Sequence, residues 1–196
     1  MSVSADGSLQ LKLIPNQYGN CTFQVTARDN GIANNESVAK EFVLEVLFKN
    51  QAPSFDLIET TLQIHEDPSC NYDCDFDGLR CLDRQCSMQN FARNISKGPQ
   101  NDLETSQLLT FVTSLGPPND GLIKSGSLTI HSNGTLVFEL TENQNGVLNV
   151  DVYLQDSGGS LDNGVDKSHV RNFSIVVIPV NDPPSFRLQT NIFTFA

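Results

Sequence analysis

The chain repeats itself, and this repeat limits the possible folds more than any other feature of the sequence. Residues 5–19 align with residues 132–146 at a constant offset of 127 positions, and residues 50–55 align with residues 181–186 at an offset of 131. The extra residues fall between the two aligned blocks, in a stretch rich in Gly, Asn and Asp that is typical of a loop. The repeating unit is therefore about 130 residues long.

Alternating apolar and polar residues predict β-strands in both copies, and more continuous apolar stretches predict buried strands. Strands are predicted over residues 9–13, 21–27, 42–48, 108–115, 127–130, 148–154 and 173–180. A single turn of helix is predicted over residues 91–96. The fold class is therefore all-β, with Ig-like or cadherin-like β-sandwich repeats and about seven strands in a complete copy.

The repeat divides the chain into one complete copy, a partial copy before it and a single strand after it. Residues 1–54 are the C-terminal half of a β-sandwich repeat, and residues 55–185 are a complete repeat with a Cys-rich insert at 70–86. Residues 186–196 are the first strand of a following repeat or a donor strand. By the alignment, residues 188–195 correspond to residues 57–64, the predicted opening strand of the complete copy. The apolar side chains predicted to carry strand donation are Leu188, Ile192, Phe193 and Phe195.

Motifs near the repeat boundaries carry a family resemblance. The stretch Val25-Thr-Ala-Arg-Asp29-Asn-Gly31, followed by an apolar strand and then by Pro-Ser-Phe55, resembles the end of a cadherin repeat. Asp156-Ser-Gly-Gly159 and Val180-Asn-Asp-Pro-Pro-Ser-Phe186 resemble the cadherin-like, Ig-like tandem domains of very large microbial surface proteins. The resemblance implies tandem β-sandwiches outside the cell, and it is specific for fold rather than for ligand.

Composition excludes two classes of partner. The net charge of −11 and pI near 4.5 disfavour nucleic acid, because a phosphate-binding surface needs clustered Lys and Arg. No stretch approaches the run of about 20 apolar residues that spans a membrane as a helix. Residues 1–7 are polar and do not resemble a signal peptide, so we expect the sequence to be a fragment of a longer chain.

Sequons and cysteines indicate an oxidising, secretory compartment. The Asn-X-Ser/Thr sequons predicted to carry glycans are Asn20, Asn35, Asn94, Asn133 and Asn172. Four cysteines lie within 17 residues and are predicted to form two disulfides, with three pairings open: Cys70, Cys74, Cys81 and Cys86. A zinc site on these four is the alternative. The fifth, Cys21, aligns with Leu148 and is predicted to be a buried thiol.

Calcium is the metal that an acidic chain of this type would bind. The stretch Asp73-Cys-Asp75-Phe-Asp77-Gly78 places carboxylates at alternate positions before a turn glycine, as in an EF-hand-type loop. Arg84 stands where that loop has its bidentate Glu, and Asp83 is the substitute ligand. The alternative is a solvated acidic loop closed by its cysteines. A second calcium hypothesis concerns the linkers, through Glu66, Asp67 or Asp182.

No catalytic constellation is present in the sequence, so we predict that the chain is not an enzyme and requires no cofactor. The histidines are isolated from one another: His65, His131 and His169. We predict a structural subunit or segment of an extracellular, glycosylated filament or stalk. Its partners are copies of itself in a head-to-tail homopolymer, or covalent neighbouring repeats, together with N-linked glycans. The alternative function is a calcium-dependent cell-surface adhesin that binds glycans or a partner cell.

Overall fold

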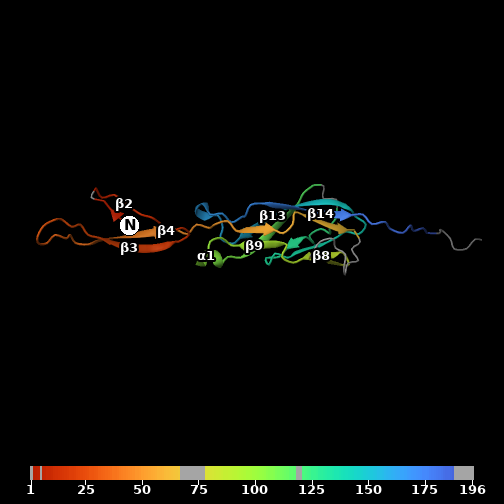
Figure 1. The fold of residues 1–196 in the computed structure, drawn as a ribbon, viewed down its shortest axis with the longest axis horizontal. Helices are drawn as coiled ribbons and strands as arrows, with labels where there is room; N and C mark the ends of the chain where they lie inside the picture. Colours follow the sequence, from red (N-terminus) through yellow and green to blue (C-terminus); the bar gives the residue numbers. More distant parts are fainter. Residues whose placement is uncertain (1, 5, 67–77, 118–120, 188–196) are drawn as a thin grey trace, which may run out of the picture. The chain divides into compact units, whose positions relative to one another are not determined.

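The computed structural model describes residues 2–4, 6–66, 78–117 and 121–187, and its regular structure is almost entirely β-strand (Figure 1). The chain forms two compact units. The first comprises Met1–Phe55, Asn94–Thr110 and Leu154–His169, and the second comprises Asp56–Arg93, Phe111–Tyr153 and Val170–Ala196. Among the described residues no helix is long and apolar enough to cross a membrane.

Four strands lie within residues 1–49. They are β1 (Ser2–Val3), β2 (Leu9–Gln10), β3 (Gly19–Val25) and β4 (Lys40–Val46). β1 pairs with β2 and β3 pairs with β4, both antiparallel, and Gly19 lies opposite Val46. In β3 and β4 alternate residues are half-buried, as the alternating sequence predicts.

The complete copy contains a four-stranded sheet of order β10-β13-β14-β6. Its members are β6 (Thr61–His65), β10 (Leu109–Leu115), β13 (Gly146–Asp156) and β14 (Arg171–Ile178). β13 and β14 are antiparallel, whereas β6 runs parallel to β14 with Ile175 opposite Leu62. The opening strand of the copy therefore lies beside its last strand.

A second four-stranded sheet has the order β11-β12-β8-β7. Its members are β7 (Leu79–Leu82), β8 (Gln85–Met88), β11 (Thr129–Ile130) and β12 (Leu136–Glu139), all antiparallel to their neighbours. β5 (Ser54–Leu57) and β9 (Ala92–Ser96) form a small separate sheet. The short helices are α1 (Asp102–Thr105) and a 3-10 turn at Leu161–Asn163.

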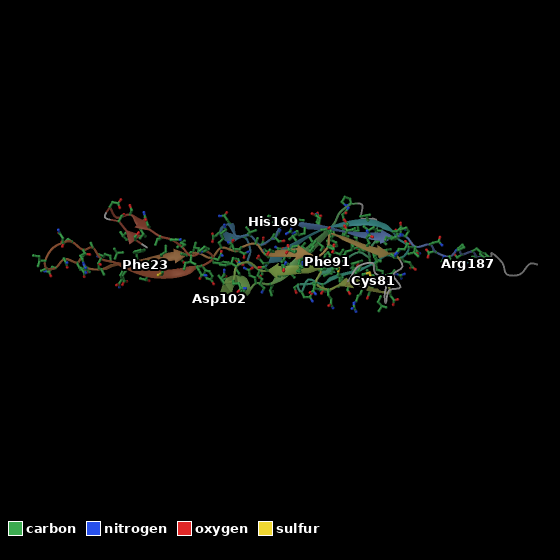
Figure 2. All side chains as sticks on the ribbon, in the orientation of Figure 1. Phe23, Cys81, Phe91, Asp102, His169 and Arg187 are labelled. Atoms are coloured by element: carbon green, nitrogen blue, oxygen red, sulfur yellow. A yellow bond between two sulfur atoms is a disulfide. The ribbon has the colours of Figure 1, made fainter. Side chains whose placement is uncertain are left out.

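The core of the complete copy is built from the inward residues of its strands. Phe91 and Phe173 meet edge to face with their ring centroids 4.8 Å apart (Figure 2 labels Phe91). Fully buried side chains around them include Leu62, Ile64, Met88, Leu136, Phe138, Leu140, Leu148 and Ile175. These residues come from both four-stranded sheets, which is the packing of a β-sandwich.

The strand registers confirm the internal repeat. Ser2 lies opposite Gln10 in the partial copy, and Thr129 lies opposite Val137 in the complete copy, each 127 positions later. β3 and β4 pair in the same register as β13 and β14: Gly19 lies opposite Val46, and the aligned residues Gly146 and Val177 lie opposite each other. β1, β2, β3 and β4 are therefore the structural counterparts of β11, β12, β13 and β14.

Two local predictions are wrong. Residues 91–96 do not form a helical turn, because Asn94 has φ +53° and residues 92–96 extend as β9. The helical turn lies instead at α1, where Asn101 accepts a hydrogen bond from the Glu104 backbone N–H at 2.9 Å as an N-cap. The predicted single opening strand over 57–64 is divided between β5 and β6.

Candidate functional site

A buried polar cluster holds the linker that enters the complete copy. We call it the Asn50 cluster: Asn50, Glu104, Gln107 and Asp156. All four side chains are buried, with Asn50 3% and Glu104 0% exposed. Polar groups at this depth require partners, because an unpaired one costs about 1–3 kcal/mol.

The amide of Asn50 is the centre of this cluster. Its Nδ2 donates to Asp156 Oδ1 at 2.9 Å and approaches the backbone carbonyls of Gly159 and Val165 at 3.0 Å each. Its Oδ1 accepts from Gln107 Nε2 at 2.7 Å. One linker side chain thereby ties together three segments that are far apart in the sequence.

Glu104 extends the cluster to the next linker residue. Its Oε1 accepts from the Gln51 backbone N–H at 2.8 Å, and its Oε2 accepts from Gln107 Nε2 at 3.0 Å. The N-cap of α1 fixes the start of the turn that carries Glu104. The linker is thus held through both its backbone and its side chain.

A glycine makes room for Asn50. A Cβ at Gly158 would lie 2.3 Å from Asn50 Oδ1, closer than any real contact. The Gly158 backbone N–H donates to Asp156 Oδ1 at 2.8 Å, which closes a tight Asx turn around the aspartate. The Asp-x-Gly motif at 156–158 is therefore required by the linker asparagine.

The second linker is held by a different acid. Glu66 is buried and accepts from the Val180 backbone N–H at 2.8 Å and from Asn145 Nδ2 at 3.1 Å. Glu66 was a candidate calcium ligand, and in the structure it fixes the chain where β14 ends. Asp182, the other described candidate, is exposed.

Residues 1–49 carry an exposed apolar face, whereas the aligned residues of the complete copy are buried in its core. Leu13 is 55% exposed, whereas its counterpart Leu140 is 0% exposed. We call this surface the β3–β4 face; its residues are Leu11, Leu13, Tyr18, Phe23, Leu44 and Val46, which line a groove of about 400 Å³. Apart from Tyr18, each of them aligns with a core position of the complete copy.

Cys21 differs from its prediction. It carries a free thiol and lines the same groove, on the face that the alignment with Leu148 predicts, but it is exposed rather than buried. The described residues of the partial copy include no counterparts of β6, β8 or β10, the strands that complete the sandwich around Leu148. The thiol therefore lies on an uncovered face.

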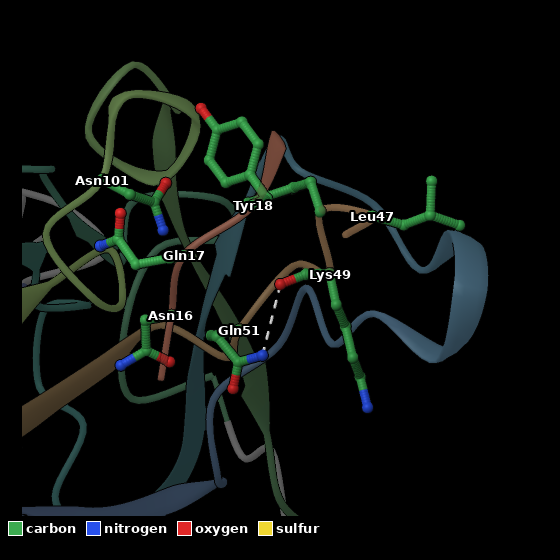
Figure 3. A pocket seen from close by; sticks show the side chains of 8 residues that line it. Asn16, Gln17, Tyr18, Leu47, Lys49, Gln51 and Asn101 are labelled. Carbon is green, nitrogen blue, oxygen red and sulfur yellow. Dashed lines mark hydrogen bonds between the residues drawn. The ribbon is translucent and has the colours of Figure 1, made fainter. Parts of the chain in front are cut away.

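Another hollow of the first unit lies around Tyr18 and Gln51 (Figure 3). Asn16, Gln17 and Asn101 give it an amide lining, and Gln51 Nε2 donates to the Lys49 carbonyl at 3.3 Å. None of its lining residues is an acid or a histidine. Its other polar lining residues are Tyr18 and Lys49.

The predicted modification sites lie at the surface where the structure describes them. Four sequon asparagines are exposed and one is half-buried; the exposed ones are Asn20, Asn94, Asn133 and Asn172. Asn35 is the half-buried one. Glycosylation itself stays a prediction.

Among the described residues one disulfide joins Cys81 and Cys86, which lie opposite each other on β7 and β8. Asp83 is exposed in the turn between these strands, where it and Arg84 both have positive φ, as a two-residue hairpin requires. Cys70, Cys74, Asp67, Asp73, Asp75 and Asp77 lie outside the described residues, as do the donor residues Leu188, Ile192, Phe193 and Phe195.

Comparison with known proteins decides the fold. No family model matches the sequence, and no curated protein matches it significantly. A crystal structure of human protocadherin-24 EC1-2 (form II) is similar over 90% of this chain and 76% of its own, with a TM-score of 0.52 and 16% identity. The chain has a cadherin-like fold. A second crystal structure of protocadherin-24 EC1-2 covers 92% of this chain and 76% of its own, with a TM-score of 0.49 and 15% identity.

Cadherin-like domains often bind calcium, which takes about six to eight oxygen ligands. The Asn50 cluster does not fit such an ion, because the amide hydrogens of Asn50 and Gln107 already occupy most of its oxygens. Among the described residues only Asp156 Oδ2 and Gln107 Oε1 are oxygens of this cluster without a partner. The same part of the chain contains no group of three or more His, Cys, Asp or Glu residues that could hold a metal.

Sequence reasoning noted Asn50 and Asp156 separately and missed that they meet. The available signal was their joint repetition: Asn50 recurs as Asn181, and Asp156 has its counterpart in Asp29. The partner Glu104 has no counterpart in the partial copy, so the repeat alone does not indicate it.

Proposed function

We propose that the chain is a segment of an extracellular, glycosylated filament or stalk whose copies associate head to tail through their β-sandwiches. The observation that supports this most is the β3–β4 face. Apart from Tyr18, its residues match core positions of the complete copy, yet Leu11 and Leu13 are exposed and Phe23, Leu44 and Val46 are only half-buried. A contiguous apolar surface of this kind marks an interface.

The energy available from this face is sufficient for association. Complete burial of one large apolar side chain contributes about 1.5–3 kcal/mol. Further burial of the half-exposed side chains that line the groove therefore contributes about 5–10 kcal/mol before the entropy cost of association. With an association cost of about 4 kcal/mol, at most about 6 kcal/mol remains, which corresponds to association at tens of micromolar or weaker from this face alone.

The proposed partner is the C-terminal segment of a neighbouring copy. Residues 188–196 follow the second linker as residues 57–65 follow the first, and Phe193 and Phe195 place apolar side chains at alternate positions. A strand from a neighbour satisfies a sheet edge and covers its apolar face together. Because donor and acceptor lie on different parts of the chain, the contact is head to tail and extends into a filament. In a covalent array the same place would be taken by the opening strand of the repeat to which residues 1–49 belong.

The remaining features agree with an extracellular, non-enzymatic role. Cadherin-like domains are typically extracellular and typically non-enzymatic. Exposed sequons such as Asn133 are accessible to glycosylation, and the Cys81–Cys86 bridge suits an oxidising compartment. The alternative adhesin function rests on the 70–86 insert, of which residues 70–77 lie outside the described part of the chain.

Deletion of residues 187–196 tests this function. The full chain should form filaments by electron microscopy and concentration-dependent oligomers by sedimentation velocity. The deletion variant should remain monomeric, while its circular dichroism and thermal unfolding show that the complete copy is still folded. Filaments that persist unchanged after the deletion would refute strand donation, and a full chain that stays monomeric at high concentration would refute self-association.

A further inference from the structure

We infer that residues 181–196 of one copy dock on residues 1–49 of another in the way that residues 50–65 dock on the complete copy, with residues 192–196 adding parallel to β4. This inference rests on the proposed function, and it specifies the edge, the direction and the register of the contact. Two independent comparisons between the copies support it: one concerns a strand edge and the other an aspartate turn.

The strand edge is that of β4. In the complete copy β14 lies between β13 and β6. Its counterpart β4 pairs with β3, the counterpart of β13, and within the described residues it pairs with no other strand. The open edge of β4 is therefore the edge that β6 occupies on β14.

The register follows from the offset of 131 positions. β6 pairs with β14 in parallel, with Leu62 opposite Ile175 and Ile64 opposite Val177. The same offset converts residues 61–65 into 192–196 and residues 174–178 into 43–47. Phe193 is thereby expected opposite Leu44, and Phe195 opposite Val46.

The chemistry of this register matches the groove. Leu62 and Ile64 are buried in the complete copy, and their counterparts Phe193 and Phe195 are larger apolar residues. Leu44 and Val46 already line the open groove, so the phenyl rings would cover apolar surface. A slip of one residue would turn Ile192 and Thr194 toward the groove in place of the two phenyl rings; that pair covers less apolar surface, which favours the stated register.

The second comparison concerns the Asp29 turn. Asp29 Oδ1 accepts from the Gly31 backbone N–H at 2.8 Å, as Asp156 Oδ1 does from Gly158. Gly158 must be glycine because Asn50 fills the space beside it. At Gly31 the nearest atoms to an added Cβ are those of Asp29 at 3.0 Å and the Ala33 carbonyl at 3.8 Å.

The Asp29 turn thus keeps the glycine that a linker asparagine requires. Asn181 is the linker asparagine that aligns with Asn50, and it is exposed, with one local hydrogen bond from Nδ2 to the Asp182 carbonyl at 3.2 Å. Asn181 of one copy is therefore expected to donate to Asp29 of the next, as Asn50 donates to Asp156.

Cysteine trapping tests the register. In the complete copy Gln63 lies opposite Val176, and the same relation places Thr194 opposite Glu45 on the outer side of the sheet. Full chains with Cys21→Ser, Glu45→Cys and Thr194→Cys should form intermolecular disulfide ladders on non-reducing gels, since paired Cα atoms lie within bridging distance. The control replaces Glu45→Cys with Glu41→Cys, which lies about 13 Å along the strand and should form no ladder.

The outcomes separate this inference from the function on which it rests. The trapping variants should first be shown to assemble under reducing conditions. If they assemble but Glu45→Cys with Thr194→Cys gives no ladder, or if the Glu41→Cys control gives an equal ladder, the register is wrong and strand donation itself still stands. Absence of assembly by the unmodified chain overturns the function itself.

The Asp29 contact has its own test. Gly31→Ala needs no positive φ, but its Cβ would lie 3.0 Å from Asp29 Oδ1, so thermal unfolding of the monomer is measured beside assembly to show that the turn is intact. The substitution should weaken assembly about tenfold by blocking Asn181, which equals about 1.4 kcal/mol. Ile32→Ala, at a fully exposed neighbour in the same loop, is the control and should leave both the monomer and its assembly unchanged. Assembly by Gly31→Ala at the concentration of the unmodified chain would overturn this contact.

Discussion

Replacement of Asn50 by Asp is the most informative single change in the complete copy. The side chain keeps its shape, but its donor becomes an oxygen. In the unmodified chain Asn50 Nδ2 lies 2.9 Å from Asp156 Oδ1; in the variant a carboxyl oxygen takes the place of Nδ2 and faces Asp156 Oδ1 instead. The carbonyls of Gly159 and Val165 lose their donor as well. The substitution therefore removes hydrogen bonds and adds repulsion without creating a cavity.

The magnitude follows from the number of donors. The Asn50 amide has two hydrogens, so it makes two full hydrogen bonds among its three contacts with Asp156, Gly159 and Val165. Each buried acceptor left unpaired costs about 1–3 kcal/mol. With the added repulsion we expect a loss of about 4 kcal/mol in the free energy of unfolding. At a urea dependence of about 2 kcal/mol per molar, the unfolding midpoint should fall by about 2 M.

Urea unfolding followed by circular dichroism at neutral pH measures this effect, and Asn181→Asp is the matched control. Asn181 is exposed with one local hydrogen bond, so its substitution should change stability by less than about 0.5 kcal/mol in the monomer. The deficit of Asn50→Asp should shrink as the pH falls from neutral towards about 4, because burial and the adjacent Asp156 raise the pKa of the new carboxyl, and its protonation restores a donor and removes the repulsion. A variant as stable as the unmodified chain would contradict the assigned role of Asn50. An unmodified chain stabilised by calcium would contradict the donor-filled description of the cluster.

Three further predictions use the repeat and the surface. Leu140→Ala should cost about 2–5 kcal/mol in chemical denaturation, whereas the aligned change Leu13→Ala should cost under about 0.5 kcal/mol in the monomer, because only the first residue is buried. Alkylation under denaturing, non-reducing conditions should label Cys21 alone, and labelling of all five cysteines would contradict the two-disulfide prediction. Peptide mapping of native material should find glycans on Asn20 and Asn133; unmodified asparagines at both sites would refute the extracellular assignment.

The sequence predicted the strands best where one face is buried and the other is solvated. β3 and β13 alternate cleanly, and both lie within one or two residues of their predicted starts and ends. The repeat offsets also agree with the structure, because β1–β2 and β3–β4 pair in the same register as their aligned counterparts in the complete copy. This agreement has a physical reason, since a register slip would expose a whole apolar face.

Prediction failed where structure depends on contacts distant in sequence. Nothing local indicates that Glu104 meets Gln51, because their approach requires the folded sandwich to place α1 beside the linker. The helical turn predicted at 91–96 is absent because Asn94 has a positive φ and residues 92–96 pair with the distant strand β5 as β9. The disulfide pairing was equally open, because strand pairing rather than cysteine spacing brings Cys81 to Cys86.

Donation between copies and supply within a covalent array differ in concentration rather than in contacts. A strand tethered by a short linker is present at an effective concentration of about 1 mM. At 1 μM protein the same strand from a neighbour is about a thousandfold less concentrated, which weakens its binding free energy by about 4 kcal/mol. Since burial of the β3–β4 face contributes about 5–10 kcal/mol before association costs, the exchanged form is sensitive to dilution and the tethered form is not.

A tethered strand therefore distinguishes the two situations. A second copy of residues 187–196, joined by a flexible linker before residue 1, should occupy the edge of β4 within the same chain and prevent assembly with other chains. The same fusion with Phe193→Ser and Phe195→Ser in the added copy should bind the face weakly and leave assembly intact. Sedimentation velocity over a hundredfold range of concentration measures both. If the fusion with the unmodified strand assembles as readily as the parent chain, the β4 edge is not the acceptor, because an edge saturated at about 1 mM cannot depend on a micromolar neighbour.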